Sequence, residues 1–226
     1  MALKRPFIKN VRNNSYNMNK LIILFCALII THSDSYSQQK FRNNASKTNI
    51  NILFIGNSLT YTNNLPELVK KSAKLQGIEI DSKMIALPNY AIIDHWNDGE
   101  VQKLITSKKY DFVIIQQGPS SQNNGRNMLI EYGKKYNSIC ELNNTKLCYF
   151  MVWPSLNNYH TFDGVIKNHK DAASINNSIL LPVGEVWKDY FDRTDDFQYY
   201  GSDGFHPSLE GSKVAAKVIV EYLFQD

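Results

Sequence analysis

The stretch "ILFIGNSLT", Ile52 to Thr60, is a run of aliphatic residues that ends abruptly in Gly-Asn-Ser. Its length and its isoleucines are typical of a buried β-strand. The segment "NNLPELVKKSAKLQG" follows, and the proline near its start and the glycine at its end predict a helix. Ser58 therefore lies in the turn between a predicted strand and a predicted helix.

The same alternation continues to the end of the chain. Further strands are predicted over 78–87, 110–118, 146–154 and 179–184, and further helices over 91–109, 126–144, 164–177 and 208–225. Unbroken apolar strands that alternate with helices indicate a parallel sheet covered on both faces. We predict the fold class α/β: a single doubly wound, flavodoxin-like domain of three layers with about five parallel strands. Ligands of such domains bind beyond the carboxyl ends of the strands.

Composition fits one globular domain with a real core, since 43% of the 226 residues are hydrophobic and 20% are charged. Part of the net charge of +4 comes from five basic residues within the first 20. The rest of the chain is nearly balanced, so its charge gives no reason to expect a nucleic-acid partner.

Residues 1–37 read as an N-terminal extension and a secretory signal peptide. Lys20 precedes the apolar run "LIILFCALII", and small and polar residues follow it. We expect cleavage near Ser37, export to the periplasm or the extracellular space, and no stable membrane insertion afterwards. An uncleaved anchor is the alternative, although a run of about ten apolar residues is short for a membrane span. Met18 is an alternative start of translation.

Three cysteines occur in the chain, and Cys26 lies inside the predicted signal. Cys140 and Cys148 form either a disulfide in an exported protein or two small buried side chains, and the sequence leaves both readings open. No metal-ligand spacing is present, so no metal or other cofactor is expected.

Ser58 follows the first predicted strand directly. At such a position a serine faces the crevice beyond the sheet, and its backbone N–H points the same way because a helix begins there. From this segment alone, a nucleophile and a simple helix cap by Ser58 or Thr60 are equally good readings.

The segment "SDGFHPSLEGSKVAA" favours the nucleophile. It carries Asp203 and His206 three residues apart in a turn-rich loop, and Ser208 is placed to cap the last helix. A serine hydroxyl needs a base to take its proton, and a histidine base needs a carboxylate to fix its tautomer. We therefore predict that Ser58, His206 and Asp203 form a catalytic triad.

The end blocks "FIGNSLT" and "SDGFHPSLEGSKVAA" resemble those of the SGNH/GDSL hydrolase superfamily. The middle segments "IIDHWNDG" and "YDFVIIQQGPSS" are similar to those of an exported bacterial subgroup with many uncharacterised members. The resemblance covers nearly the whole chain after Thr48, which implies an SGNH hydrolase domain over 48–226. It also implies that Ser58 is the nucleophile, His206 the general base and later acid, and Asp203 the residue that orients the histidine.

The resemblance implies an oxyanion hole as well, with the Ser58 N–H as one donor. Asn89 in "LPNYA" stands where the family has a glycine that supplies a second backbone N–H, and a side chain there requires an uncommon backbone conformation. In "GPSS", Ser120 stands where the family has an asparagine, with Gln117 or Gln116 as the alternative donor.

The function implied by the resemblance is a serine esterase that acts on a small O-acyl group, with an acetyl ester of a carbohydrate as substrate. The partner would be a small-molecule or glycan ester. Two alternatives stay open: a non-catalytic protein that binds carbohydrate or cell envelope, and an O-acyltransferase. Four aromatic residues are candidates either for a sugar-binding face or for packing: Tyr90, Trp96, Trp153 and Tyr159. Three histidines receive no role: His95, His160 and His169.

Overall fold

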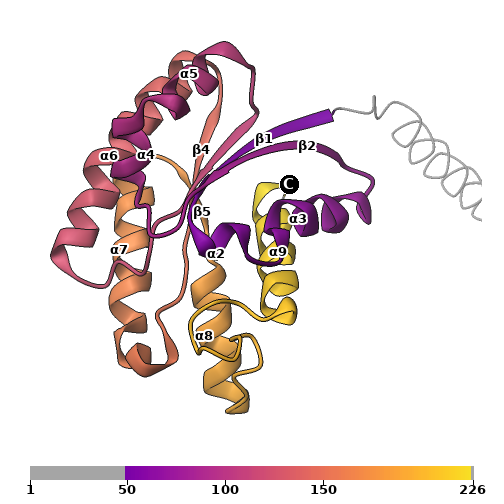
Figure 1. Cartoon of the computed structure of the whole chain (residues 1–226), viewed down its shortest axis with the longest axis vertical. Coiled ribbons are helices and arrows are strands. Elements are labelled where there is room, and N and C mark those ends of the chain that lie inside the picture. The colour runs from indigo at the N-terminus through magenta and orange to yellow at the C-terminus, as the bar shows by residue number, and fades with distance from the viewer. Residues whose placement is uncertain (1–48, 225–226) are drawn as a thin grey trace, which may run out of the picture. The chain divides into compact units, whose positions relative to one another are not determined.

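Five parallel strands form one sheet in the computed structural model of the chain, which describes residues 49–224 (Figure 1). The predicted signal, residues 1–37, lies outside the described residues. The strands are β1 (Asn49–Gly56), β2 (Glu79–Ala86), β3 (Phe112–Ile115), β4 (Lys146–Phe150) and β5 (Ile179–Leu181), in the order β2-β1-β3-β4-β5. Every neighbouring pair is parallel. The predicted α/β fold with about five parallel strands is confirmed.

Helices cover both faces of this sheet. They are α2 (Ser58–Tyr61), α3 (Leu65–Lys74), α4 (Ile92–Asp98), α5 (Glu100–Ser107), α6 (Asn123–Leu142), α7 (Phe162–Ile175), α8 (Val183–Thr194) and α9 (Leu209–Leu223). Two short 3₁₀ helices, η1 (Thr62–Asn64) and η2 (Leu156–Thr161), interrupt the connections. Figure 1 shows α4, α5, α6 and α7 on one side of the sheet and α3, α8 and α9 on the other.

Alternate side chains of β1 point to opposite faces of the sheet, and both faces are buried. Ile52 and Phe54 join the core beneath α3, α8 and α9, whereas Leu53 and Ile55 join the core beneath α4, α5 and α6. All four side chains are fully buried. A strand in the middle of such a sheet is apolar without alternation, as the quoted stretch is.

Two elements differ from the prediction. The strand predicted over 179–184 ends at Leu181, and α8 follows, because Pro182 lacks the N–H that a strand would donate. Val183, Trp187 and Phe191 are buried at helical spacing, so the signal for α8 was present in the sequence. The helix predicted over 91–109 is two helices, because Gly99 takes a left-handed conformation with φ 74°.

Cys140 and Cys148 are both buried and are not bonded to each other. Burial raises the pKa of the Cys140 thiol to about 12 and raises the pKa of the Cys148 thiol as well. Both thiols therefore stay protonated at neutral pH and act as small core residues. In the part of the chain that the structure describes, no helix is both long enough and apolar enough to cross a membrane.

Candidate active site

Ser58 is the first residue of α2, and the residue before it caps the helix. The Asn57 side-chain oxygen accepts a hydrogen bond from the Leu59 N–H at 3.1 Å. Asn57 is thus the N-cap of α2. The Ser58 hydroxyl is therefore not needed as a helix cap and is available to react.

The turn that carries Ser58 is tied to the end of β3 by Gln116. The Gln116 Oε1 accepts hydrogen bonds from the Asn57 N–H at 2.9 Å and from the Thr60 hydroxyl at 2.7 Å. Gly56 makes this possible, because a Cβ there would lie 2.5 Å from Gln116 Oε1. Gln116, the alternative oxyanion donor of the sequence analysis, is a buried support for the turn.

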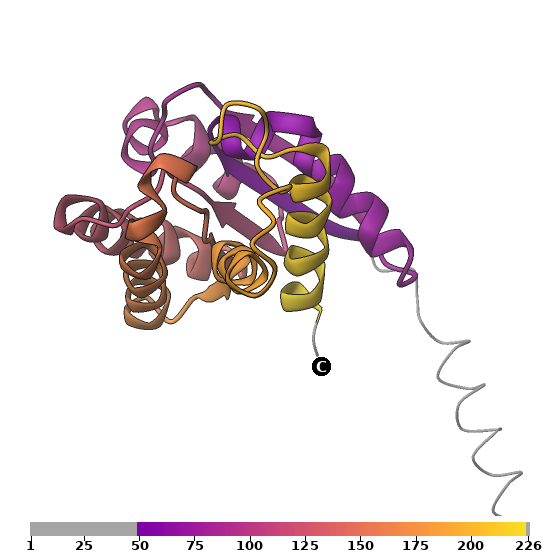
Figure 2. The same ribbon diagram turned by 90° about the horizontal axis from the view of Figure 1, so that it is seen from below.

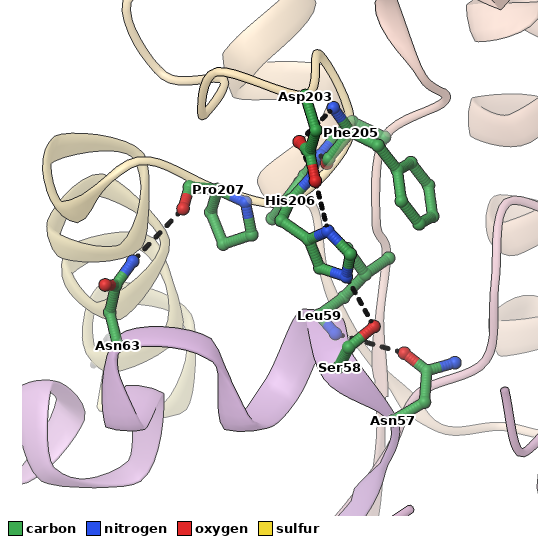
Figure 3. Close-up of polar contacts among 9 residues, drawn as sticks. Asn57, Ser58, Leu59, Asn63, Asp203, Phe205, His206 and Pro207 are labelled. Carbon is green, nitrogen blue, oxygen red and sulfur yellow. Dashed lines mark hydrogen bonds and ion pairs between the residues drawn. The ribbon is translucent and has the colours of Figure 1, made fainter. Parts of the chain in front are cut away.

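Ser58, His206 and Asp203 form a continuous chain of hydrogen bonds, as Figure 3 shows. The Ser58 Oγ lies 2.8 Å from His206 Nε2, and His206 Nδ1 lies 2.6 Å from Asp203 Oδ2. With the Nδ1 proton donated to the carboxylate, Nε2 is left to accept the serine proton. This is the arrangement that activates a serine hydroxyl as a nucleophile.

Asp203 is held as a carboxylate by its surroundings. The hydrogen bond from His206 lowers the pKa of Asp203, and the backbone N–H of Phe205 lowers this pKa further. The Phe205 and His206 N–H groups both donate to Asp203 Oδ1, each at 2.9 Å. The second carboxylate oxygen therefore stays free to orient the histidine ring.

The loop before α9 reaches Ser58 because the segment just after β4 and the start of η2 hold it. The Trp153 indole N–H donates to the Phe205 carbonyl at 3.0 Å, and the Leu156 N–H donates to the Gly204 carbonyl at 2.7 Å. Gly204 has a φ of 65°, a conformation that glycine adopts without strain. Figure 2 shows this loop crossing to the end of the sheet near α2.

Two further contacts fix the part of this loop that leads into α9. The Ser208 hydroxyl caps α9 by accepting from the Gly211 N–H at 3.1 Å. The Asn63 amide donates to the Pro207 carbonyl at 3.1 Å (Figure 3). The segments that carry Ser58 and His206 are 148 residues apart in sequence and are joined directly in space.

A pocket of about 370 Å³, here called the serine pocket, opens beside Ser58. Its lining includes Ser58, Asn89, Tyr90, Gln117, Met128 and Phe205. Among the described residues no acceptor is hydrogen-bonded to the backbone N–H of Ser58 or of Asn89. Both N–H groups are thus unoccupied donors at residues of this pocket.

Asn89 has a φ of 62°, in the left-handed region that glycine adopts freely. Among residues with a side chain, asparagine enters this region more readily than most. The uncommon conformation expected at this position from the sequence is therefore present. Asn89 keeps the backbone shape of a glycine, and its exposed side chain lies on the rim of the serine pocket.

Gln117 and Ser120, the other predicted oxyanion donors, hydrogen-bond to each other. The Gln117 Nε2 donates to the Ser120 hydroxyl at 2.7 Å and to the Gly125 carbonyl at 3.3 Å, and the Ser120 hydroxyl donates to the Gly118 carbonyl at 2.9 Å. Gln117 lines the serine pocket. The protons of both side chains are already used, and their role as oxyanion donors stays a prediction.

Most of the aromatic candidates are packing residues. Trp153 is fully buried and stacks on Trp187 with 3.5 Å between ring centroids. Tyr159 packs among phenylalanines and donates to Asp192 at 2.5 Å, and Trp96 packs edge-on against Tyr136. Among the four candidates, Tyr90 alone lines the serine pocket.

The histidines without a predicted role divide in two. His95 and His169 are buried, with His95 Nε2 at 2.8 Å from the Gly56 carbonyl and His169 Nδ1 at 2.8 Å from the Val165 carbonyl. His160 is exposed and lines a second pocket close to the first. His160 lies in the segment after β4, at the edge of the sheet where ligands of such folds bind.

No group of three or more histidine, cysteine, aspartate or glutamate side chains within residues 49–224 is arranged to hold a metal ion.

Solved structures with this architecture are SGNH hydrolases, lipases and esterases. A protein of Slackia heliotrinireducens, provisionally assigned as an SGNH hydrolase, is 21% identical with a TM-score of 0.67, over 78% of this chain and 100% of that one. A lipase/acylhydrolase from Enterococcus faecalis is 17% identical with a TM-score of 0.61, over 76% and 94%. A variant of an acetyl-xylooligosaccharide esterase from Geobacillus stearothermophilus is 14% identical with a TM-score of 0.60, over 80% and 97%.

No protein-family model matches the chain, and no curated protein sequence matches it. The structural likeness shows that the chain has the SGNH hydrolase fold, so the resemblance seen in the sequence is confirmed at the level of the fold.

Proposed function

We propose that this protein is a serine ester hydrolase that cleaves a small O-acyl ester through an acyl-enzyme intermediate. The observation that carries the proposal is the unbroken chain from Ser58 Oγ to His206 at 2.8 Å and from His206 to Asp203 at 2.6 Å. A fold alone does not imply an activity, whereas this geometry supports the proposed roles of nucleophile, base and orienting carboxylate.

In the proposed reaction His206 Nε2 takes the hydroxyl proton as Ser58 Oγ attacks the ester carbonyl carbon. The negative charge moves to the carbonyl oxygen, which accepts from the N–H groups of Ser58 and Asn89. The carbon–oxygen bond to the alcohol then breaks, and His206 gives its proton to the leaving oxygen. A water molecule, deprotonated by His206, then attacks the acyl carbon; the bond from this carbon to Ser58 Oγ breaks, His206 returns the proton to Ser58 Oγ, and the acid is released.

The proposed substrate is an acetyl or similarly short ester on a carbohydrate, and the proposed site of action is outside the cytoplasm. A serine pocket of about 370 Å³ is near the lower end of the range for small-molecule sites and has room for a small ester. One of the structural neighbours is an acetyl-xylooligosaccharide esterase by name. The proposal of export rests on the pattern of residues 1–37 in the sequence.

Hydrolysis of p-nitrophenyl acetate by the purified domain tests this function. We expect the Ser58→Ala variant to lose activity by about a thousandfold or more, because the nucleophile is gone. Ser107→Ala is the matched control, since this serine is exposed at the end of α5 and bonds only to the helix carbonyl of Leu104. Equal rates for wild type and Ser58→Ala would refute the proposal and leave the non-catalytic binding protein as the better reading.

A further inference from the structure

A second pocket of about 500 Å³, here called the polar pocket, lies next to the serine pocket. Pro119 and Phe205 line both pockets, so the two are neighbours across these side chains. The remaining walls of the polar pocket come from the loop after β3 and from the segment after β4 that includes η2. Both segments follow strand ends, so this pocket opens at the same edge of the sheet as Ser58.

The lining of the polar pocket is rich in hydrogen-bonding groups. Its residues include Ser121, Gln122, Asn158 and His160, and none is aspartate, glutamate, lysine or arginine. Within residues 49–224 the side chains of Ser121, Gln122 and His160 make no hydrogen bond. Unpaired neutral donors and acceptors suit a ligand that is itself neutral and polar.

The polar pocket also offers apolar surface. Pro119, Pro154 and Phe205 are the apolar residues of its lining. A sugar unit has both kinds of surface, since its hydroxyls lie around the ring and its C–H groups lie on the faces, where they pack against aromatic side chains. A fatty chain would leave the polar groups of this pocket unpaired, which carries a cost.

The geometry of the proposed reaction places the alcohol half of the ester on the side of the polar pocket. The carbonyl oxygen must face the N–H groups of Ser58 and Asn89 in the serine pocket, while the alcohol oxygen must face His206 Nε2 to receive its proton. Phe205 is the neighbour of His206, and its ring centroid lies 5.2 Å from the histidine ring. An alcohol that leaves on the His206 side therefore meets Phe205, which is the wall shared with the polar pocket.

We propose that the polar pocket is the binding site for a neutral carbohydrate, the alcohol half of the ester, while the serine pocket takes the acyl half. This inference rests on the proposed esterase function for its orientation of the ester. The binding of a sugar to Gln122 and His160 is a separate claim that does not depend on catalysis.

The first test measures binding without chemistry. Calorimetry of the Ser58→Ala protein with the unacetylated β-1,4-linked trisaccharides of xylose, glucose and N-acetylglucosamine gives a Kd for each. For at least one of them we expect the added changes Gln122→Ala and His160→Ala to weaken binding about tenfold or more, because two hydrogen-bonding groups are lost. Gln76→Ala, an exposed glutamine at the end of α3, is the control and should leave Kd unchanged.

Neither substitution should disturb the fold. Gln122 is the N-cap of α6, but its side chain makes no capping hydrogen bond, and His160 is exposed without a partner among the described residues. Equal melting temperatures of parent and variant verify this.

The second test separates this inference from the proposed function. With an intact Ser58, the Gln122→Ala/His160→Ala variant should lose about tenfold in kcat/KM on the acetylated trisaccharide and at most about twofold on p-nitrophenyl acetate, because a nitrophenyl group carries no hydroxyl groups for these two side chains to bind. Activity on p-nitrophenyl acetate without binding of any trisaccharide would overturn the inference and leave the esterase standing. Trisaccharide binding that depends on the polar pocket, in a protein inactive on both esters, would overturn the esterase and keep the pocket.

Discussion

Asn89 combines the backbone conformation of a glycine with a polar side chain. Its left-handed φ of 62° directs the chain as a glycine would, and its N–H has no acceptor within the described part of the chain. In the proposed reaction the oxyanion accepts from this main-chain donor and from the Ser58 N–H. The Asn89 side-chain amide, on the rim of the same pocket, is the competing donor.

The Asn89→Gly variant decides between the two donors. We expect kcat/KM on p-nitrophenyl acetate to change by less than about fivefold, because the N–H remains, whereas loss of a needed donor costs about a hundredfold or more. Asn144→Gly is the control, since Asn144 also has a positive φ, of 53°, at the end of α6. A hundredfold loss in Asn89→Gly alone would assign the role to the side chain.

At the scale of elements, the segment just after β4 holds the loop that carries His206. Trp153 and Trp187 stack in the core, yet their indole N–H groups differ: that of Trp153 donates to the Phe205 carbonyl, and that of Trp187 is buried without a partner among residues 49–224. One tryptophan therefore holds the loop that carries His206, and the other contributes packing only.

Replacing each tryptophan by phenylalanine tests this difference. Both changes remove part of a buried ring and should lower the free energy of unfolding by about 1–3 kcal/mol. Only Trp153→Phe should also lower kcat/KM, by about tenfold, because the Phe205 carbonyl loses its donor and the loop its anchor. Urea unfolding and steady-state kinetics measure the two effects, and identical activities of the two variants would contradict the anchoring role.

The five strands and the Asp203–His206 pair were predictable from local patterns, whereas α8 and the pockets were not. The apolar runs gave the five strands, and the spacing of Asp203 and His206 indicated a pair that the structure brings together at 2.6 Å. The helix α8 was missed because Pro182 and Val183 extend an apolar run that reads as strand. The polar pocket was missed because Gln122 and His160 meet only when the loops after β3 and β4 fold beside each other.

At the scale of the whole molecule, buried histidines couple stability to pH. Burial lowers the pKa of His169 to about 4 and lowers the pKa of His95 as well. His169 Nε2 has no partner in the described structure, so a proton there would place a charge in the core. The unfolded chain has no such restriction and protonates these rings near their usual pKa of about 6.5.

The sign of the pH effect follows from the number of protons that the folded and the unfolded state bind. Between pH 6.5 and pH 4 the unfolded state binds the proton at His169 and the folded state does not, so stability falls as the pH falls through this window. The full contribution is present at neutral pH and amounts to up to about 3 kcal/mol for His169. Chemical denaturation across this range should show the slope, and His169→Leu should reduce it, whereas the exposed His160→Ala should not. An unchanged slope in His169→Leu would show that His169 does not couple stability to pH.

The most direct test of the central claim, that Ser58 is activated by His206, is the intact mass of the protein after reaction with a fluorophosphonate. We expect a single covalent adduct on the wild type and none on Ser58→Ala, because only an activated serine displaces fluoride under mild conditions. We also expect none on His206→Ala, since the base is missing. Absence of an adduct on the wild type, under conditions that label a known serine esterase, would contradict the proposed function.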